Sequence, residues 1–135
     1  MTNHERAQQL FSEALGIAEE MRRALERGRW NLAARRAQEV IELVLKGLLS
    51  EIGVEYPRTH DAAPVLVEAI RQRRLEADPA FLDWMGGLSG RLAEIRGPAF
   101  YHEIEVGEDE ARSAVDAAER VVVFGRDLLG RLRNS

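Results

Sequence analysis

The stretch that decides the fold is NLAARRAQEVIELVLKGLLSEI, residues 31–52. Its apolar side chains recur at steps of three and four, which places them on one face of a helix. They are Ala33, Ala37, Val40, Ile41, Val44, Leu45, Leu48, Leu49 and Ile52. We therefore predict a helix from about Asn31 or Leu32 to Ile52. So wide an apolar face predicts that this helix is buried on two sides.

The sequence on either side of this stretch carries the same periodicity. We predict four further helices, at about His4–Glu26, Ala62–Leu75, Pro79–Arg96 and Glu108–Leu132. Gly28 is expected to cap the end of the first, and Gly53 ends the second. Together these patterns predict an all-α protein, an antiparallel up-and-down bundle of four to five helices formed by one domain over residues 1–135.

Three glycines interrupt the predicted helix at 79–96, namely Gly86, Gly87 and Gly90. Each costs a helix about 1 kcal/mol relative to alanine. Two interpretations stay open. The glycines permit close helix contact or a kink near Gly86, or the helix has a gap there.

Composition narrows the class of protein. Of the 135 residues 45% are hydrophobic and 31% are charged, which suits a soluble domain with a core. The chain has no cysteine, in keeping with a cytoplasmic location. No apolar run reaches the roughly 20 residues that cross a bilayer, so we expect no membrane contact. The three histidines lack metal-ligand spacing and the common nucleotide-binding loops are absent, so we predict no metal and no cofactor.

The most informative polar segment is RGPAFYH, residues 96–102. A glycine and a proline follow Arg96 directly, so the chain must leave the helix axis there. This break lets the side chains of Arg96 and His102 converge, with Tyr101 beside the histidine. Histidine transfers protons near neutral pH, and arginine neutralises phosphate oxygens. The plainer interpretation is that Arg96 caps a helix and His102 is an ordinary loop residue.

The chain resembles the HEPN domain family. The match in the second helix lies at Ala37, Gln38, Glu42, Lys46, Leu48 and Leu49, after a bulky Trp30. A Thr-His-Asp cap follows at residues 59–61, and an alanine-rich final helix carries Ala-Ala-Glu-Arg at 117–120. The family signature is an arginine and, four to six residues later, a histidine. Arg96 and His102, with five residues between them, fit it.

This resemblance implies an α-helical bundle that dimerises and brings two copies of the motif into one cleft. It also implies a metal-independent endoribonuclease, as in the members that are toxins paired with a small nucleotidyltransferase antitoxin (MNT). Arg96, His102 and Tyr101 would then be catalytic. Active members often carry Asn or Asp after the arginine, whereas this chain has Gly97. The alternative is a non-catalytic helical dimer that binds a nucleotide or docks the nucleotidyltransferase.

Two further features bear on partners. Apolar residues beyond one stripe on the second and last helices predict a two-fold homodimer. Glu39, Glu42 and Lys46 form part of a polar stripe and are candidate ligand-binding residues facing the dimer cleft, or else a solvated helix face. The net charge of −4 means that binding of RNA or a nucleotide needs a local basic patch.

Overall fold

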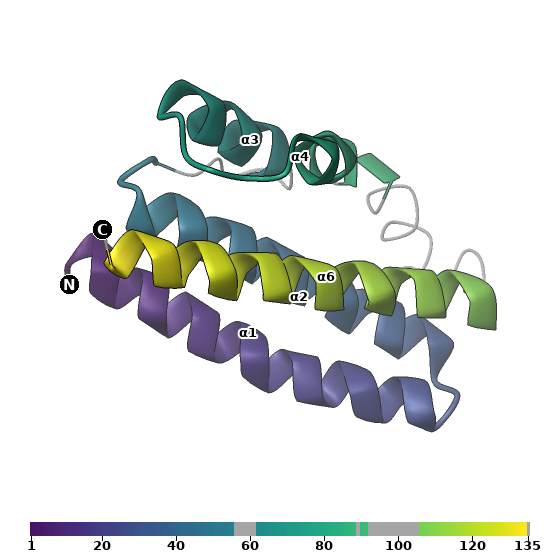
Figure 1. The fold of residues 1–135 in the computed structure, drawn as a ribbon. Helices are drawn as coiled ribbons and strands as arrows, with labels where there is room; N and C mark the ends of the chain where they lie inside the picture. The colour runs from purple at the N-terminus through teal and green to yellow at the C-terminus, as the bar shows by residue number, and fades with distance from the viewer. Residues whose placement is uncertain (56–61, 89, 92–105, 135) are drawn as a thin grey trace.

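The computed structural model describes residues 1–55, 62–88, 90–91 and 106–134 (Figure 1). The helices are α1 (Asn3–Glu26), α2 (Trp30–Glu51), α3 (Ala62–Gln72), α4 (Pro79–Gly86) and α6 (Glu108–Arg133). Within these ranges there is no strand, and the predicted all-α bundle is confirmed. None of the described helices is both long and apolar enough to span a membrane.

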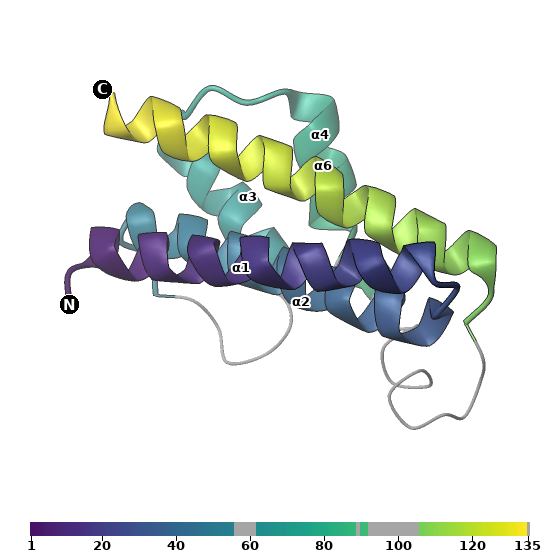
Figure 2. The same cartoon turned by 90° about the horizontal axis from the view of Figure 1, so that it is seen from below.

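Three long helices, α1, α2 and α6, make up the main layer of the fold (Figure 1). α2 packs against both of the others, while α3 and α4 lie across the side opposite α1. α1 and α2 are antiparallel, whereas α6 runs in the same direction as α2 (Figure 2). The crossing through α3 and α4 allows this arrangement, because it returns the chain to the far end before α6 begins.

The core lies between α2 and its neighbours. Eight of the nine apolar residues predicted for its inner face are buried, and Ile52 is half-buried. The prediction that α2 is buried on two sides is therefore confirmed. The chain ends meet at one end of this layer. There the carboxylate of Glu51, whose side chain is 9% exposed, lies 3.0 Å from His4 Nδ1 and 4.0 Å from Arg133 Nε.

Left-handed residues end three of the helices. After α1, Gly28 has φ +69° and the amide of Arg29 donates to Ala24 O at 2.9 Å, so the predicted glycine cap is confirmed. Gly53, at φ +76°, ends α2 in the same way. α3 stops at Gln72, earlier than the predicted Leu75, because Arg74 takes up this conformation at φ +54°.

The prediction of one helix from Pro79 to Arg96 was wrong in its extent. α4 begins as expected, with Asp78 Oδ1 accepting from the amide of Ala80 at 3.0 Å, but it ends at Gly86. Gly87 forms a turn and the chain is helical again at Leu88. Glycine favours a helix less than every residue except proline, so the helix breaks where two glycines, Gly86 and Gly87, follow each other. The alternative of a gap at Gly86 matches the structure.

Candidate functional site

The predicted catalytic residues Arg96, Tyr101 and His102 lie outside the described residues, and so does His60. The chain on either side of the motif is described. The described residues nearest the motif segment are Arg91 before it and Val106 after it. The candidate site therefore consists of residues that border this segment.

A side chain from α2 binds the backbone of Val106, just before α6. Asn31, in the first turn of α2, accepts a hydrogen bond through Oδ1 from the amide of Val106 at 2.8 Å. Val106 is 5% exposed, so its amide has little access to water and needs a protein partner. Gly107 then caps α6, and its amide donates to the Glu110 carboxylate. The first bond places Val106 against the start of α2, and the second caps the start of α6.

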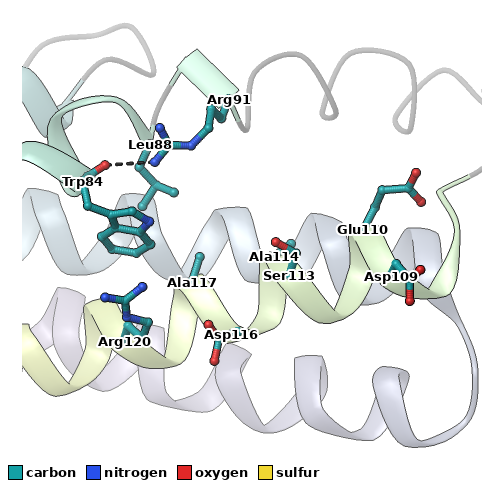
Figure 3. Close-up of a pocket in the computed structure, with 10 residues that line it drawn as sticks. All are labelled: Trp84, Leu88, Arg91, Asp109, Glu110, Ser113, Ala114, Asp116, Ala117 and Arg120. Atoms are coloured by element: carbon teal, nitrogen blue, oxygen red, sulfur yellow. Dashed lines mark hydrogen bonds between the residues drawn. The ribbon is translucent and has the colours of Figure 1, made fainter. Parts of the chain in front are cut away.

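A cleft of about 480 Å³ lies between the end of α4 and the first half of α6 (Figure 3). Arg91, the last described residue before the motif segment, is on one wall. The first turn of α6, which follows the segment, is on the other. The lining residues are Trp84, Leu88, Arg91, Asp109, Glu110, Ser113, Ala114, Asp116, Ala117 and Arg120. The cleft therefore borders both ends of the segment that carries Arg96 and His102.

One end of the cleft contains two guanidinium groups and an indole. Arg120 Cζ lies 4.3 Å from the centre of the Trp84 ring, within cation–π distance. The same carbon is 5.8 Å from the Phe81 ring, which packs against Trp84 with its centroid 5.2 Å away. Arg91 Nη2 donates to the carbonyl oxygen of Trp84 at 2.9 Å. Trp84 thus lies between the two arginines (Figure 3).

The other end of the cleft is acidic. Asp109 and Glu110 come from the first turn of α6, where carboxylates favour the positive end of the helix dipole. Asp116 lies further along α6, one helical turn before Arg120, so it borders the arginine end (Figure 3). The charge is therefore divided along the cleft, with two arginines and Asp116 at the Trp84 end and carboxylates alone towards Gly107. An anionic group is favoured only at the arginine end.

The predicted ligand-binding residues on α2 lie elsewhere. Glu39, Glu42 and Lys46 are half-buried, and in the part of the chain that the structure describes none of them lines this cleft. Glu39 accepts a hydrogen bond from Arg36 at 2.5 Å, and both Glu42 and Lys46 have interaction partners. Their role in ligand binding stays a prediction.

Sequence reasoning did not find the arginine end of the cleft. Arg120 entered only through the alanine-rich helix pattern, and Arg91 entered through none. No spacing rule joins these two residues, which line one cleft from distant parts of the chain. A search for metal-binding clusters among the described residues finds no group of three or more His, Cys, Asp or Glu side chains suited to hold an ion.

Comparison with known families assigns the chain. The model of the HEPN domain matches residues 7–128. The chain belongs to the HEPN family. The match runs from α1 to near the end of α6, so it includes the motif segment and every residue that lines the cleft. The resemblance predicted from the sequence is confirmed. Comparisons of this HEPN domain with curated proteins and with solved structures gave no match.

Proposed function

We propose that this HEPN protein is a metal-independent endoribonuclease in which Arg96 and His102 act at a dimer cleft, with Tyr101 beside them. The observation that carries the proposal is the position of the cleft. It borders both ends of the motif segment, and it presents two guanidinium groups at one end. Guanidinium groups can hold the phosphates of an RNA strand, which cleavage of that strand requires.

The chemistry needs no metal ion. A neutral histidine takes the proton from a ribose 2′-OH, whose oxygen attacks the adjacent phosphorus. Arg96 stabilises the added negative charge on the phosphorane oxygens. A protonated histidine then donates its proton to the departing 5′-oxygen, leaving a 2′,3′-cyclic phosphate and a 5′-hydroxyl. Two copies of His102 in a dimer supply both the base and the acid.

The dimer has partial support. HEPN domains often dimerise. The wide apolar face of α2 is buried within the protomer, so it does not supply a dimer surface. On α6, Val123 is 68% exposed beside the half-buried Phe124, and these residues could pack against a second protomer. Light scattering on the purified protein would test this part of the proposal, with a mass near twice 15.2 kDa expected. We place the protein in the cytoplasm, as the toxin partner of an MNT nucleotidyltransferase.

The decisive experiment is an RNA cleavage assay in the presence of EDTA. Wild type is compared with Arg96→Ala and His102→Ala, and His60→Ala is a control of the same residue type outside the motif. We expect cleavage by wild type and His60→Ala, with products ending in 2′,3′-cyclic phosphate, and at least a hundredfold loss in the motif variants. Equal cleavage by wild type and His102→Ala, or none by wild type, removes the proposal.

A second function, a non-catalytic helical dimer that docks a nucleotidyltransferase or binds a nucleotide, has its own support. Gly97 follows Arg96 where active relatives often have a polar residue. In addition, an open apolar groove of about 580 Å³ runs between α4 and α6, lined in part by Phe81, Val123 and Phe124. Co-purification with the nucleotidyltransferase, and calorimetry with ATP, test this function. Binding without RNA cleavage would favour it.

A further inference from the structure

We propose that Arg91 and Arg120, on opposite sides of Trp84, form an RNA-binding subsite in which each contacts a different phosphate of a single strand. The inference deepens the proposed ribonuclease function and rests on it for the identity of the strand. It starts from the arginine end of the cleft, where the structure places two guanidinium groups around Trp84 (Figure 3).

The guanidinium of Arg120 is preorganised to bind an anion. Its guanidinium lies over the indole of Trp84, with Cζ 4.3 Å from the ring centre. Stacking occupies the face of a guanidinium and leaves its in-plane N–H groups pointing outwards as a fork that fits phosphate oxygens. The side chain is exposed, so an incoming strand can reach it. Because the stack already limits its rotamers, binding loses less conformational entropy than with a free arginine.

Arg91 is restrained from the opposite side. One of its five N–H donors goes to the Trp84 carbonyl at 2.9 Å, and the guanidinium carries four more. The bond ties this guanidinium to the same residue that supports Arg120. Arg91 is also exposed, and it directly precedes the motif segment in the chain. A phosphate held here would therefore lie close to where that segment begins.

The remaining charges of the cleft confine an RNA strand to the arginine end. Asp109 and Glu110 line the other end, and a polyanion running along the whole cleft would meet their carboxylates, while Asp116 lies one helical turn before Arg120 (Figure 3). The strand is therefore expected to touch the arginine end and then turn away. A small local patch of this kind is also how a chain with net charge −4 can bind RNA at all.

The test measures RNA binding without cleavage. The probe is a fluorescein-labelled oligoribonucleotide with 2′-O-methyl groups throughout, which lacks the nucleophile and stays intact. Anisotropy titrations compare wild type with Arg91→Gln and Arg120→Gln. The matched control is Arg126→Gln, which removes the same charge from an exposed position of α6 outside the cleft. Arg120→Lys keeps the charge but loses the planar fork.

We expect Arg91→Gln and Arg120→Gln each to weaken binding about tenfold, since each removes a charge-assisted hydrogen bond to a phosphate. Each should also lower the slope of log K against log[KCl] by about 0.7, the value for one contact with single-stranded nucleic acid. Arg126→Gln should change binding less than about twofold, and Arg120→Lys should fall between. Thermal unfolding of each variant identifies any that are misfolded. If Arg120→Gln is misfolded, Arg120→Lys replaces it in the comparison.

Equal weakening by Arg126→Gln and Arg120→Gln would overturn the subsite, because it would show only a general charge effect. Unchanged binding by Arg120→Gln would do the same. Tighter binding of AMP than of the oligonucleotide would replace the strand with a free nucleotide and also overturn it. A further outcome separates the two proposals. If the wild-type protein cleaves no RNA, but Arg120→Gln binds the oligonucleotide more weakly than wild type does, the subsite is supported and the ribonuclease proposal is removed.

Discussion

Gly125 lies in the middle of α6, where that helix meets both α1 and α2. A methyl group at this position would come 2.6 Å from Val44 Cγ1 and 2.8 Å from Phe11 Cζ. Val44 is fully buried and Phe11 is 6% exposed, so neither side chain can move into water. Val44 is also β-branched and has little rotamer freedom in a helix. We predict that Gly125→Ala destabilises the protein, although alanine is the better helix former.

Two opposing effects set the magnitude. Replacing glycine by alanine inside a helix gains about 1 kcal/mol of stability. Forcing an extra carbon into a filled core costs about 1–3 kcal/mol. The net change for Gly125→Ala is therefore a loss of up to about 2 kcal/mol. Gly16→Ala is the matched control, because Gly16 is exposed on α1 and a methyl group there meets no atom within 4 Å. This control should gain roughly 0.5–1 kcal/mol.

The assay is urea unfolding followed by circular dichroism at one protein concentration for all variants. The two alanine variants share the propensity gain, so the difference between their free energies of unfolding isolates the steric cost. Val44→Ala removes the nearest methyl group, and in the double variant with Gly125→Ala the two losses should be less than additive. If Gly125→Ala is as stabilising as Gly16→Ala, the close packing of α6 inferred here is wrong.

Three further predictions concern single contacts. Asn31→Ala leaves the buried amide of Val106 unpaired and should cost about 1–3 kcal/mol in urea unfolding, whereas Asn31→Asp, which keeps the acceptor, should cost clearly less; equal losses would contradict this. Arg74→Gly relieves a left-handed arginine and should raise stability by roughly 0.5–1 kcal/mol, and a lower melting temperature would argue against it. A double-mutant cycle on Arg22 and Glu119 should give a coupling of about 0.5–1 kcal/mol that vanishes in high salt, because the pair is bidentate but exposed. The hydrogen bond to Glu119 raises the pKa of Arg22. Arg22 therefore stays charged at every pH below the ordinary arginine pKa, and its titration does not change the coupling energy in that range.

Much of the fold could be predicted because its signals are local. The apolar stripe of α2 repeats at helical spacing over many turns, and it faces the core in the structure as expected. Gly28 and Gly53 end helices because a left-handed residue costs glycine little. Arg74 does the same without that signal, and so the end of α3 was misplaced. The family also follows from residue order, and its model matches residues 7–128.

The site depended on contacts that residue order does not record. Gly16 and Gly125 are both helix glycines in an apolar pattern, yet one faces solvent and the other touches Val44. Arg91 and Arg120 come from distant parts of the chain and share a cleft only in the folded protein. Helix periodicity depends on a few neighbouring residues, so a linear pattern contains it. The distance between two helix faces depends on every side chain between them, so it appears only when the whole core is assembled.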